Sequence, residues 1–314
     1  MRVTVLGGTG FIGRHVARQL VEAGEEVTTV ERGTSAAADS TVPALKADRN
    51  DAVALANALE AAAPTVLIDM IAYRQQHIGG LLDVLPASVE RLVVISSGDV
   101  YATYGAFLGI DRGPVESQPS NEQAMLRTEL FPYRREARGP GDPFFWYEKI
   151  LVERTAMAWS GGATTILRLP MVYGPNDRQR RVAKYVEKFR DDAGSLRLNT
   201  VEAAWRCTRG YVEDVAAAIK LAALTEASVG EIFNVGEPEA LSGAEWARAI
   251  AGATGWEGEI VLDPAAPPER EANWNINLVV DTSRIRDVLG FAEPFGVELG
   301  LRHTVASSAS ENHN

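Results

Sequence analysis

Four glycines near the start of the chain have the type and spacing of a phosphate-binding turn. Gly7, Gly8, Gly10 and Gly13 follow a β-branched run, and apolar residues then recur at helical spacing from Phe11 onward. Glycine lets the chain turn without a Cβ and brings backbone N–H groups close to a pyrophosphate, and the positive end of the next helix faces that charge. The order strand, tight turn, helix therefore predicts a dinucleotide site, in which Gly13 lets the helix lie close to the strand.

An acidic residue follows at the distance that such a site requires. The next apolar run ends at Glu31, about 20 residues after the turn, where a carboxylate can bind the hydroxyls of the adenosine ribose. Glu31 would repel a 2′-phosphate and so favours NAD(H). Arg32 comes directly after it and is able to clamp that phosphate, so NADP(H) stays possible.

Alternating strand and helix patterns are expected to position this turn. They predict an α/β chain with a Rossmann-type doubly wound parallel sheet and a smaller C-terminal α+β substrate domain. The Rossmann domain is expected over residues 1–170, and residues 206–225 return to it. The substrate domain is expected over residues 171–205 and 226–306. The predicted strands are 3–6, 27–30, 66–69, 92–96, 165–169 and 231–235. The predicted helices are 11–23, 51–61, 78–85, 144–160, 181–191, 215–224 and 297–306.

Capping residues and breakers refine these bounds. Asp142 and Pro143 predict the start of the helix over 144–160, and Ser242 with Glu245 forms a capping box for a helix that runs to about residue 254. Asp281 is expected to cap a helix that ends before residue 290. Residues 98–141, rich in Gly, Pro and charge, predict an irregular segment at the ligand edge of the sheet, interpreted as a substrate lid. Residues 307–314 are expected to be a flexible tail.

Composition limits the partners and the compartment. The chain of 314 residues carries a net charge of −11, so its surface repels phosphate backbones, and neither nucleic acid nor membrane is expected as a partner. No apolar run approaches the roughly 18 residues of a membrane span. No secretory segment is recognised, and the single cysteine, Cys207, fits a reducing compartment, so a cytoplasmic protein is expected. Without clustered Cys and His, no metal site is expected.

Further motifs lie in order along nearly the whole chain. They are Ser96-Ser97-Gly98-Asp99-Val100-Tyr101, Arg168 to Pro175, Arg209 to Val215, and Phe233 to Gly236. With the glycine turn they resemble the extended, atypical short-chain dehydrogenase/reductase superfamily of the NAD-dependent epimerase/dehydratase type. The resemblance implies an oxidoreductase, epimerase or dehydratase that uses NAD(P)(H) on a carbonyl or carbinol of a small-molecule or sugar-like substrate. It also suggests a homodimer, by analogy alone.

The resemblance assigns roles to individual residues. Asp48 corresponds to the aspartate at the adenine amino group, and Met70 to Ala72 to the strand end beneath the cofactor. The full implied cofactor set is Gly7, Gly10, Phe11, Ile12, Gly13, Glu31, Arg32, Asp48, Arg49, Met70, Ile71, Ala72, Lys149 and Pro170. The implied substrate set is Tyr101, Tyr104, Met171 and Arg209. Met171 stands where sugar-nucleotide members carry Asn, whereas Arg209 matches an arginine that is able to hold a substrate phosphate.

The catalytic motif departs from the family pattern of Tyr-x-x-x-Lys followed by Glu. Lys149 and Glu153 set the register, and Phe145 occupies the place of the tyrosine. This matters because hydride transfer needs a group that gives or takes the proton of the substrate oxygen, and a tyrosine beside an ammonium does so. Phenylalanine keeps the bulk of the ring and loses the proton. Lys149 retains its implied contact with the nicotinamide ribose, and Ser97 occupies the catalytic Ser/Thr position.

Several side chains remain candidates for the missing acid. Tyr147 lies two residues before Lys149, but on a regular helix that step turns by about 200°, so Tyr147 serves only if the helix is irregular there; otherwise it is a packed aromatic. Asp99 stands where dehydratase relatives carry an acid, and Tyr101 or Tyr104 is able to reach in from the loop. The sequence leaves the proton carrier open among them.

Two other functions stay open because of Phe145. One is a non-catalytic NAD(P)-binding sensor or regulatory protein, since superfamily relatives include redox-sensing regulators and the chloroplast stem-loop RNA-binding proteins. The net charge of −11 disfavours the RNA version. The other is a lyase or isomerase in which the nucleotide is only structural.

Overall fold

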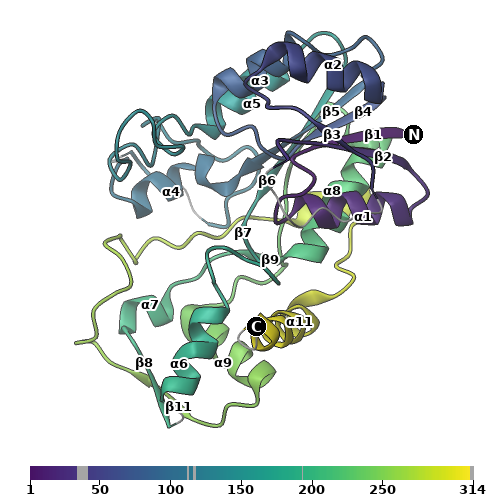
Figure 1. Cartoon of the computed structure of the whole chain (residues 1–314). Helices are drawn as coiled ribbons and strands as arrows, with labels where there is room; N and C mark the ends of the chain where they lie inside the picture. Colours follow the sequence, from purple (N-terminus) through teal and green to yellow (C-terminus); the bar gives the residue numbers. More distant parts are fainter. Residues whose placement is uncertain (34–41, 112, 116–117, 193, 312–314) are drawn as a thin grey trace.

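A parallel sheet forms the centre of the computed structural model, which describes residues 1–33, 42–111, 113–115, 118–192 and 194–311 (Figure 1). Its strands are β1 (Arg2–Leu6), β2 (Glu26–Glu31), β3 (Ala44–Lys46), β4 (Val66–Asp69), β5 (Arg91–Ser97), β6 (Ala163–Leu169) and β10 (Ile232–Asn234). The order across the sheet is β10-β6-β5-β4-β1-β2-β3. This confirms the predicted Rossmann-type fold, and the strand order reverses beside β1, the point where such sheets bind ligands.

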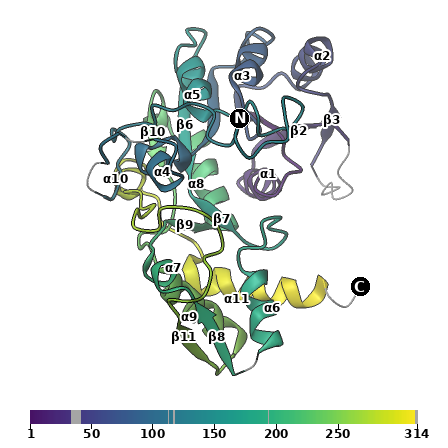
Figure 2. The ribbon, with the colours of Figure 1, turned by 90° about the vertical axis from the view of Figure 1, so that its left-hand side faces the viewer.

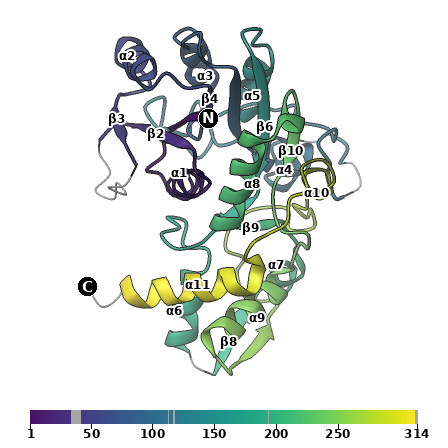
Figure 3. The same ribbon diagram turned by 90° about the vertical axis from the view of Figure 1, so that its right-hand side faces the viewer.

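Helices cover both faces of the sheet, as Figure 3 shows. One layer holds α2 (Ala52–Ala62), α3 (Gln75–Leu82) and α5 (Lys149–Met157), and the other holds α1 (Gly13–Glu22) and α8 (Val212–Leu224). Successive side chains of a strand point to opposite faces. In β5, Leu92 and Val94 therefore join the core under the first layer, and Val93 and Ile95 join the core under the second. The strands are buried on both faces, and their near-continuous apolar runs reflect this.

A smaller α+β part lies below the sheet in Figures 1 and 2. It contains α6 (Ala183–Asp191), β8 (Ser195–Leu198), α7 (Thr200–Ala204), α9 (Gly243–Thr254), β11 (Glu259–Leu262) and α11 (Gly296–Glu311). Strands β8 and β11 pair in parallel, and the two-stranded ribbon of β7 (Met171–Tyr173) and β9 (Arg209–Tyr211) joins the two parts of the molecule. The capping box of α9 is present as predicted, with Ser242 and Glu245 bonded to each other's backbone N–H groups.

The stretch 226–306 is more divided than we predicted. Strand β10 pairs with β6 in the main sheet, after the short η2 (Glu226–Ser228), and α10 (Ser283–Leu289) packs beside β10. Thr282, not Asp281, holds the N-cap position of α10, and Asp281 instead accepts from the N–H of Ser283. Helix α11 continues through Glu311, so the tail predicted from 307 is wrong up to that residue; 312–314 lie outside the described residues.

The largest error in the predicted elements concerns the start of α5. The predicted helix began at 144, but Asp142 only closes a turn at Phe144, and α5 begins at Lys149. Glu148 is held extended (φ −159°) because its buried carboxylate binds Arg127 and the N–H groups of Phe131 and Ile150.

The segment 98–141 is not irregular throughout. It contains η1 (Gly98–Val100) and α4 (Ala102–Phe107), the latter beside loops at the left of Figure 1. In the part of the chain that the structure describes, no helix is long and apolar enough to cross a membrane.

Candidate functional site

The glycine turn between β1 and α1 has the shape that a diphosphate requires. Gly7 has φ +89°, and a Cβ on Gly8 would lie 2.4 Å from Thr29 Cγ2. A Cβ on Gly13 would lie 2.3 Å from the carbonyl oxygen of Gly7, so the start of α1 rests directly on the turn. The N–H groups of Phe11 and Ile12 have no acceptor within the described ranges. These free donors at a helix N-terminus suit phosphate oxygens.

Two acidic side chains lie beyond the turn, at the ends of neighbouring strands. Glu31 ends β2, and its Oε2 atom is buried without a hydrogen-bond partner among the described residues, as expected of an atom that awaits a ribose hydroxyl. Asp48 follows β3 and is exposed, and hydrogen bonds from the backbone and side chain of Asn50 lower the pKa of its carboxyl group. Arg32 is exposed beside them. The residues present therefore fit an adenosine dinucleotide.

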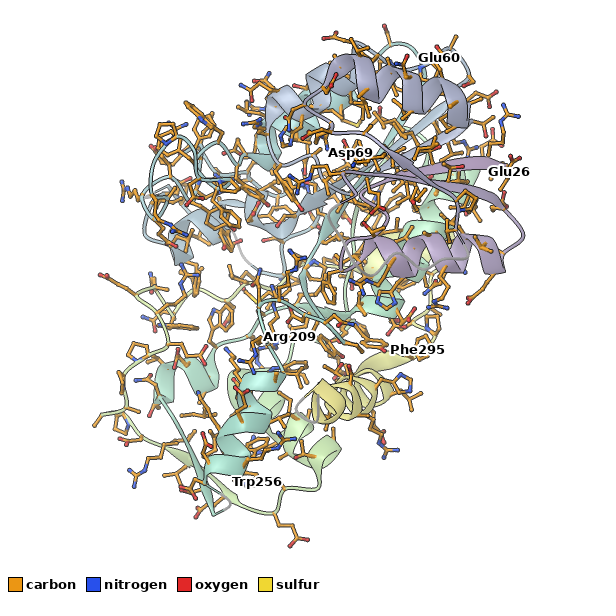
Figure 4. All side chains as sticks on the ribbon, in the orientation of Figure 1. Glu26, Glu60, Asp69, Arg209, Trp256 and Phe295 are labelled. Carbon is orange, nitrogen blue, oxygen red and sulfur yellow. The ribbon has the colours of Figure 1, made fainter. Side chains whose placement is uncertain are left out.

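Arg49 has a different environment from the other predicted cofactor contacts. Its guanidinium makes two hydrogen bonds of 2.9 Å with the carboxylate of Asp69, which is fully buried at the end of β4, and a third of 2.7 Å with the carbonyl of His77. Asp69 also accepts from the N–H of Ile71, whose side chain lies against Gly7. The Arg49–Asp69 pair thus fixes the strand end Met70–Ala72 beneath the glycine turn. Figure 4 labels Asp69 at this place.

Lys149 lies at the first residue of α5 and is almost fully buried. Its ammonium group donates to the carbonyl of Ala72 at 2.8 Å and to that of Ile95 at 2.7 Å. It therefore joins the ends of β4 and β5 at the predicted cofactor edge. Burial lowers the pKa of Lys149 to about 8.

Tyr147 points into the site, and Phe145 does not. Because α5 begins at Lys149, the helical rotation that separates positions 147 and 149 does not apply. The hydroxyl of Tyr147 donates to Asp99 Oδ2 at 2.8 Å. Phe145 is partly exposed and packs against Trp146 and the guanidinium of Arg134. The phenol is thus supplied from a residue outside the helix.

Asp99 is a buried acid of the site. It lies on η1, where its N–H donates to Ser97 Oγ, and its Oδ2 accepts a second hydrogen bond of 3.0 Å from Tyr133. Its Oδ1 is buried without a partner among the described residues. Burial raises the pKa of Asp99 above its usual value, and it raises the pKa of Tyr147 well above 10. In this arrangement Tyr147 keeps its proton and donates it as a hydrogen bond to the Asp99 carboxylate.

The two tyrosines predicted as substrate contacts have different positions. Tyr101 is fully buried; its hydroxyl donates to Asn234 at 2.7 Å and accepts from Arg168 at 2.9 Å. It braces the ends of β5, β6 and β10 and does not face the site. Tyr104, on α4, lies within 3.0 Å of the hydroxyl of Tyr133 and so belongs to the surroundings of Asp99.

The other predicted contacts lie where the two parts of the molecule meet. Arg209 is buried there (Figure 4), bonded to the carbonyl of Leu241 at 2.9 Å and positioned over the Trp246 ring. Pro170 links β6 to β7, and Met171 begins β7 with its sulfur 3.8 Å from Cys207 Sγ.

Sequence reasoning missed Asp69, Tyr73 and Tyr133. Asp69 had a signal, since it is an acid at the end of a fully buried strand. Tyr73 stacks on Tyr147 at 6.1 Å, and only the three-dimensional arrangement shows it. Tyr133 lies in a stretch without periodicity, so the sequence carries no signal for it.

Known proteins resemble this chain along its whole length. A curated relative, the chloroplast stem-loop binding protein of 41 kDa b of Arabidopsis thaliana, is 24% identical over 275 residues, covering 83% of this chain and 65% of the relative. The chain thus spans just under two thirds of that relative. Among solved structures, UDP-glucose 4-epimerase of Thermus thermophilus in complex with NAD is 23% identical with a TM-score of 0.72, covering 98% of this chain and 99% of that one.

Two more solved structures share the fold. UDP-glucose 4-epimerase of Thermotoga maritima with UDP-glucose is 20% identical with a TM-score of 0.72, over 99% of this chain and 100% of that one. A putative epimerase from Burkholderia cenocepacia is 22% identical with a TM-score of 0.74, over 98% of each chain. The family described as "NAD dependent epimerase/dehydratase" matches residues 3–236. Since this match includes the glycine turn, Asp99, Tyr147 and Lys149, the chain belongs to the NAD dependent epimerase/dehydratase family.

Proposed function

We propose that the protein is an NAD(H)-dependent oxidoreductase of the epimerase/dehydratase type, in which Tyr147 and Asp99 together handle the proton of the substrate. The observation that carries the proposal is the hydrogen bond of 2.8 Å from the Tyr147 hydroxyl to the buried carboxylate of Asp99. It lies beside Ser97 and Lys149, the residues that the family pattern retains. A phenol and a base are therefore present although Phe145 has no hydroxyl.

The chain's own residues can move the proton in two linked transfers. As the hydroxyl hydrogen of a carbinol substrate passes to the oxygen of Tyr147, the proton of Tyr147 passes to Asp99 Oδ2, which already accepts it as a hydrogen bond. Burial raises the pKa of Asp99, which suits it to take and return a proton. Ser97 is positioned to hold the same substrate oxygen. Bound NAD supplies the hydride acceptor.

The choice of NAD(H) over NADP(H) rests on Glu31. Its buried, unpartnered Oε2 suits a ribose hydroxyl and would repel a 2′-phosphate. The T. thermophilus epimerase of the same fold binds NAD, which agrees with this choice.

The substrate we propose is a small carbinol or carbonyl compound, not a nucleotide sugar. The T. maritima epimerase binds UDP-glucose. Here, however, the guanidinium of Arg209 binds the backbone carbonyls of Cys207 and Leu241 and lies over Trp246, and Met171 offers no hydrogen-bond donor. These contacts make both side chains poor phosphate ligands.

One observation favours a second function, that of a non-catalytic NAD-binding regulatory protein. Lys149 is held by two backbone carbonyls, so a contact with a nicotinamide ribose would require it to leave at least one of them. The curated relative is named for stem-loop binding and not for catalysis.

Two measurements separate these functions. Calorimetric titration with NAD⁺ tests the site, and absorbance of the reduced nicotinamide, recorded with UDP-sugars and with small carbinols, tests hydride transfer. With a reactive compound in hand, we expect Tyr147→Phe to lower turnover by about 10²–10⁴-fold and to leave NAD⁺ affinity within about twofold. Phe145→Tyr is the matched control and should not change the rate, because position 145 faces away from Asp99.

Three results count against the proposal. Absence of NAD⁺ binding would refute the proposed NAD(H)-dependent function. Binding without reduction by any compound would favour the regulatory function. Full activity of Tyr147→Phe would show that another group moves the proton.

A further inference from the structure

Two phenols from separate stretches of the chain share one oxygen of Asp99. Tyr147 donates to Oδ2 at 2.8 Å from the residues just before α5, and Tyr133 donates to the same atom at 3.0 Å from the segment 109–148. Asp99 and Tyr147 are buried, and Tyr133 is half-buried. A buried carboxylate that accepts two phenolic hydrogens is held in a single orientation.

One more hydrogen bond extends beyond Tyr133 to Tyr104, and ring contacts continue from there to the second part of the molecule. The hydroxyl of Tyr104 lies 3.0 Å from that of Tyr133, and since the hydrogen of Tyr133 points to Asp99, Tyr104 is the donor of this pair. The ring of Tyr104 packs on Phe107 at 6.3 Å. Phe107 in turn stacks on Trp205 at 5.2 Å, next to α7. A continuous path therefore leads from Asp99 to the boundary between the two parts.

The charged groups around Asp99 do not replace Tyr133. Arg127 donates to the backbone carbonyl of Asp99 and is paired with Glu148 at 3.1 Å. The ammonium group of Lys149 is bonded to backbone carbonyls. The carboxylate therefore depends on the two phenols for its direct hydrogen bonds within the described residues, and Oδ1 has none.

We propose that Tyr133 is a positioning residue of the proton-transfer site: it orients the Asp99 carboxylate for Tyr147 and, through Tyr104, links it to the second part of the molecule. Without the hydrogen bond from Tyr133, the Asp99 carboxylate would bind a proton more tightly, because a donor to its charged form is lost. The catalytic meaning rests on the proposed function, but the test below needs neither cofactor nor substrate.

The test is the titration of Asp99 in the full-length protein. The carboxyl signal is followed by infrared difference spectroscopy or NMR with isotope-labelled aspartate, and Asp99→Asn identifies it. We expect Tyr133→Phe to raise the measured pKa of Asp99 by about one unit, roughly a tenfold gain in proton affinity, because a donor to the charged form is lost. Tyr104→Phe should raise it less. Tyr185→Phe, on α6, is the matched control and should leave it unchanged.

A rise in the pKa of Asp99 that is larger in Tyr133→Phe than in Tyr104→Phe, with no change in Tyr185→Phe, supports the inference. An unchanged titration in a folded Tyr133→Phe protein overturns it, and so does an equal shift in Tyr185→Phe. If Tyr133→Phe does not fold, Tyr104→Phe decides by the same criterion. If the pKa of Asp99 shifts as expected but the protein does not bind NAD⁺, the positioning role of Tyr133 stands and only the proposed reaction is refuted.

Discussion

Replacing Arg49 by Met tests whether this residue supports the fold or contacts the cofactor. The guanidinium makes two hydrogen bonds with Asp69 and one with the carbonyl of His77. Its loss leaves the Asp69 carboxylate fully buried, with the N–H of Ile71 as its remaining donor among the described residues. Breaking a buried ion pair in this way costs about 3–5 kcal/mol. We therefore expect the free energy of unfolding to fall by that amount, a large part of the usual total of about 5–15 kcal/mol.

The assay is urea unfolding followed by tryptophan fluorescence, run as a double-mutant cycle. Arg49→Met and Asp69→Leu each remove one partner, and the double variant removes both charges. We expect the double variant to be more stable than the sum of the single losses predicts, by about 2–3 kcal/mol, because no unpaired charge remains. NAD⁺ affinity is measured under conditions where each variant is folded. The loss in binding free energy should be smaller than the loss in the free energy of unfolding.

Two results would refute this reasoning. If Arg49→Met unfolds at the urea concentration of the wild type, the pair does not hold the strand end. If the stability is unchanged and NAD⁺ affinity drops instead, Arg49 is a direct cofactor contact, as the family resemblance implied.

Three further predictions concern separate sites. Glu31→Gln removes the charge that opposes a 2′-phosphate, so NADP⁺ affinity relative to NAD⁺ should rise roughly tenfold in competition titrations; an unchanged ratio would place the ribose elsewhere. Ser242→Ala loses the N-cap of α9 and should cost about 1 kcal/mol in urea unfolding, and no loss would contradict the capping geometry. Burial raises the pKa of Glu237 to about 7. This pKa lies above that of Glu237 in the unfolded chain. Protonated Glu237 therefore stabilises the folded state at low pH, and this stabilisation is lost as the pH rises through 7. Unfolding free energy should thus fall by up to about 3 kcal/mol between about pH 5 and about pH 8, and Glu237→Gln should flatten that slope.

The sheet was predictable from sequence because its strands are buried on both faces. Short apolar runs such as Val66–Asp69 are typical of strands that are buried on both faces. The glycine turn identifies the run before it as the first strand of the sheet. Strand β3 escaped prediction because it is an edge strand of three residues, Ala44–Lys46, with little burial. Helix α4 escaped because it has six residues, and its buried positions, Thr103, Gly105 and Phe107, do not form an apolar pattern at helical spacing.

The site was only partly predictable, because its key contacts join residues far apart in sequence. Position 101 shows the limit: the tyrosine was expected at the substrate, but Arg168 and Asn234 bind its hydroxyl inside the molecule. Those partners lie 67 and 133 residues away. Tyr133 shows the converse, since its contact with Asp99 spans 34 residues through a segment without periodicity. Motif spacing predicts which elements lie next to each other. Which side chain faces the site depends on hydrogen bonds between residues far apart in the sequence.

The register of α5 explains how the chain can keep the chemistry after losing the tyrosine at 145. With a helix running through 144–160, Tyr147 and Lys149 would point to nearly opposite sides. Glu148 prevents that helix: its carboxylate is fixed by Arg127 and caps Ile150, so the helix can begin only at Lys149. The extended residue at 148 turns Tyr147 toward Asp99 while Lys149 reaches the carbonyls of Ala72 and Ile95. The Arg127–Glu148 pair is therefore the structural condition for a Tyr-x-Lys arrangement to replace Tyr-x-x-x-Lys.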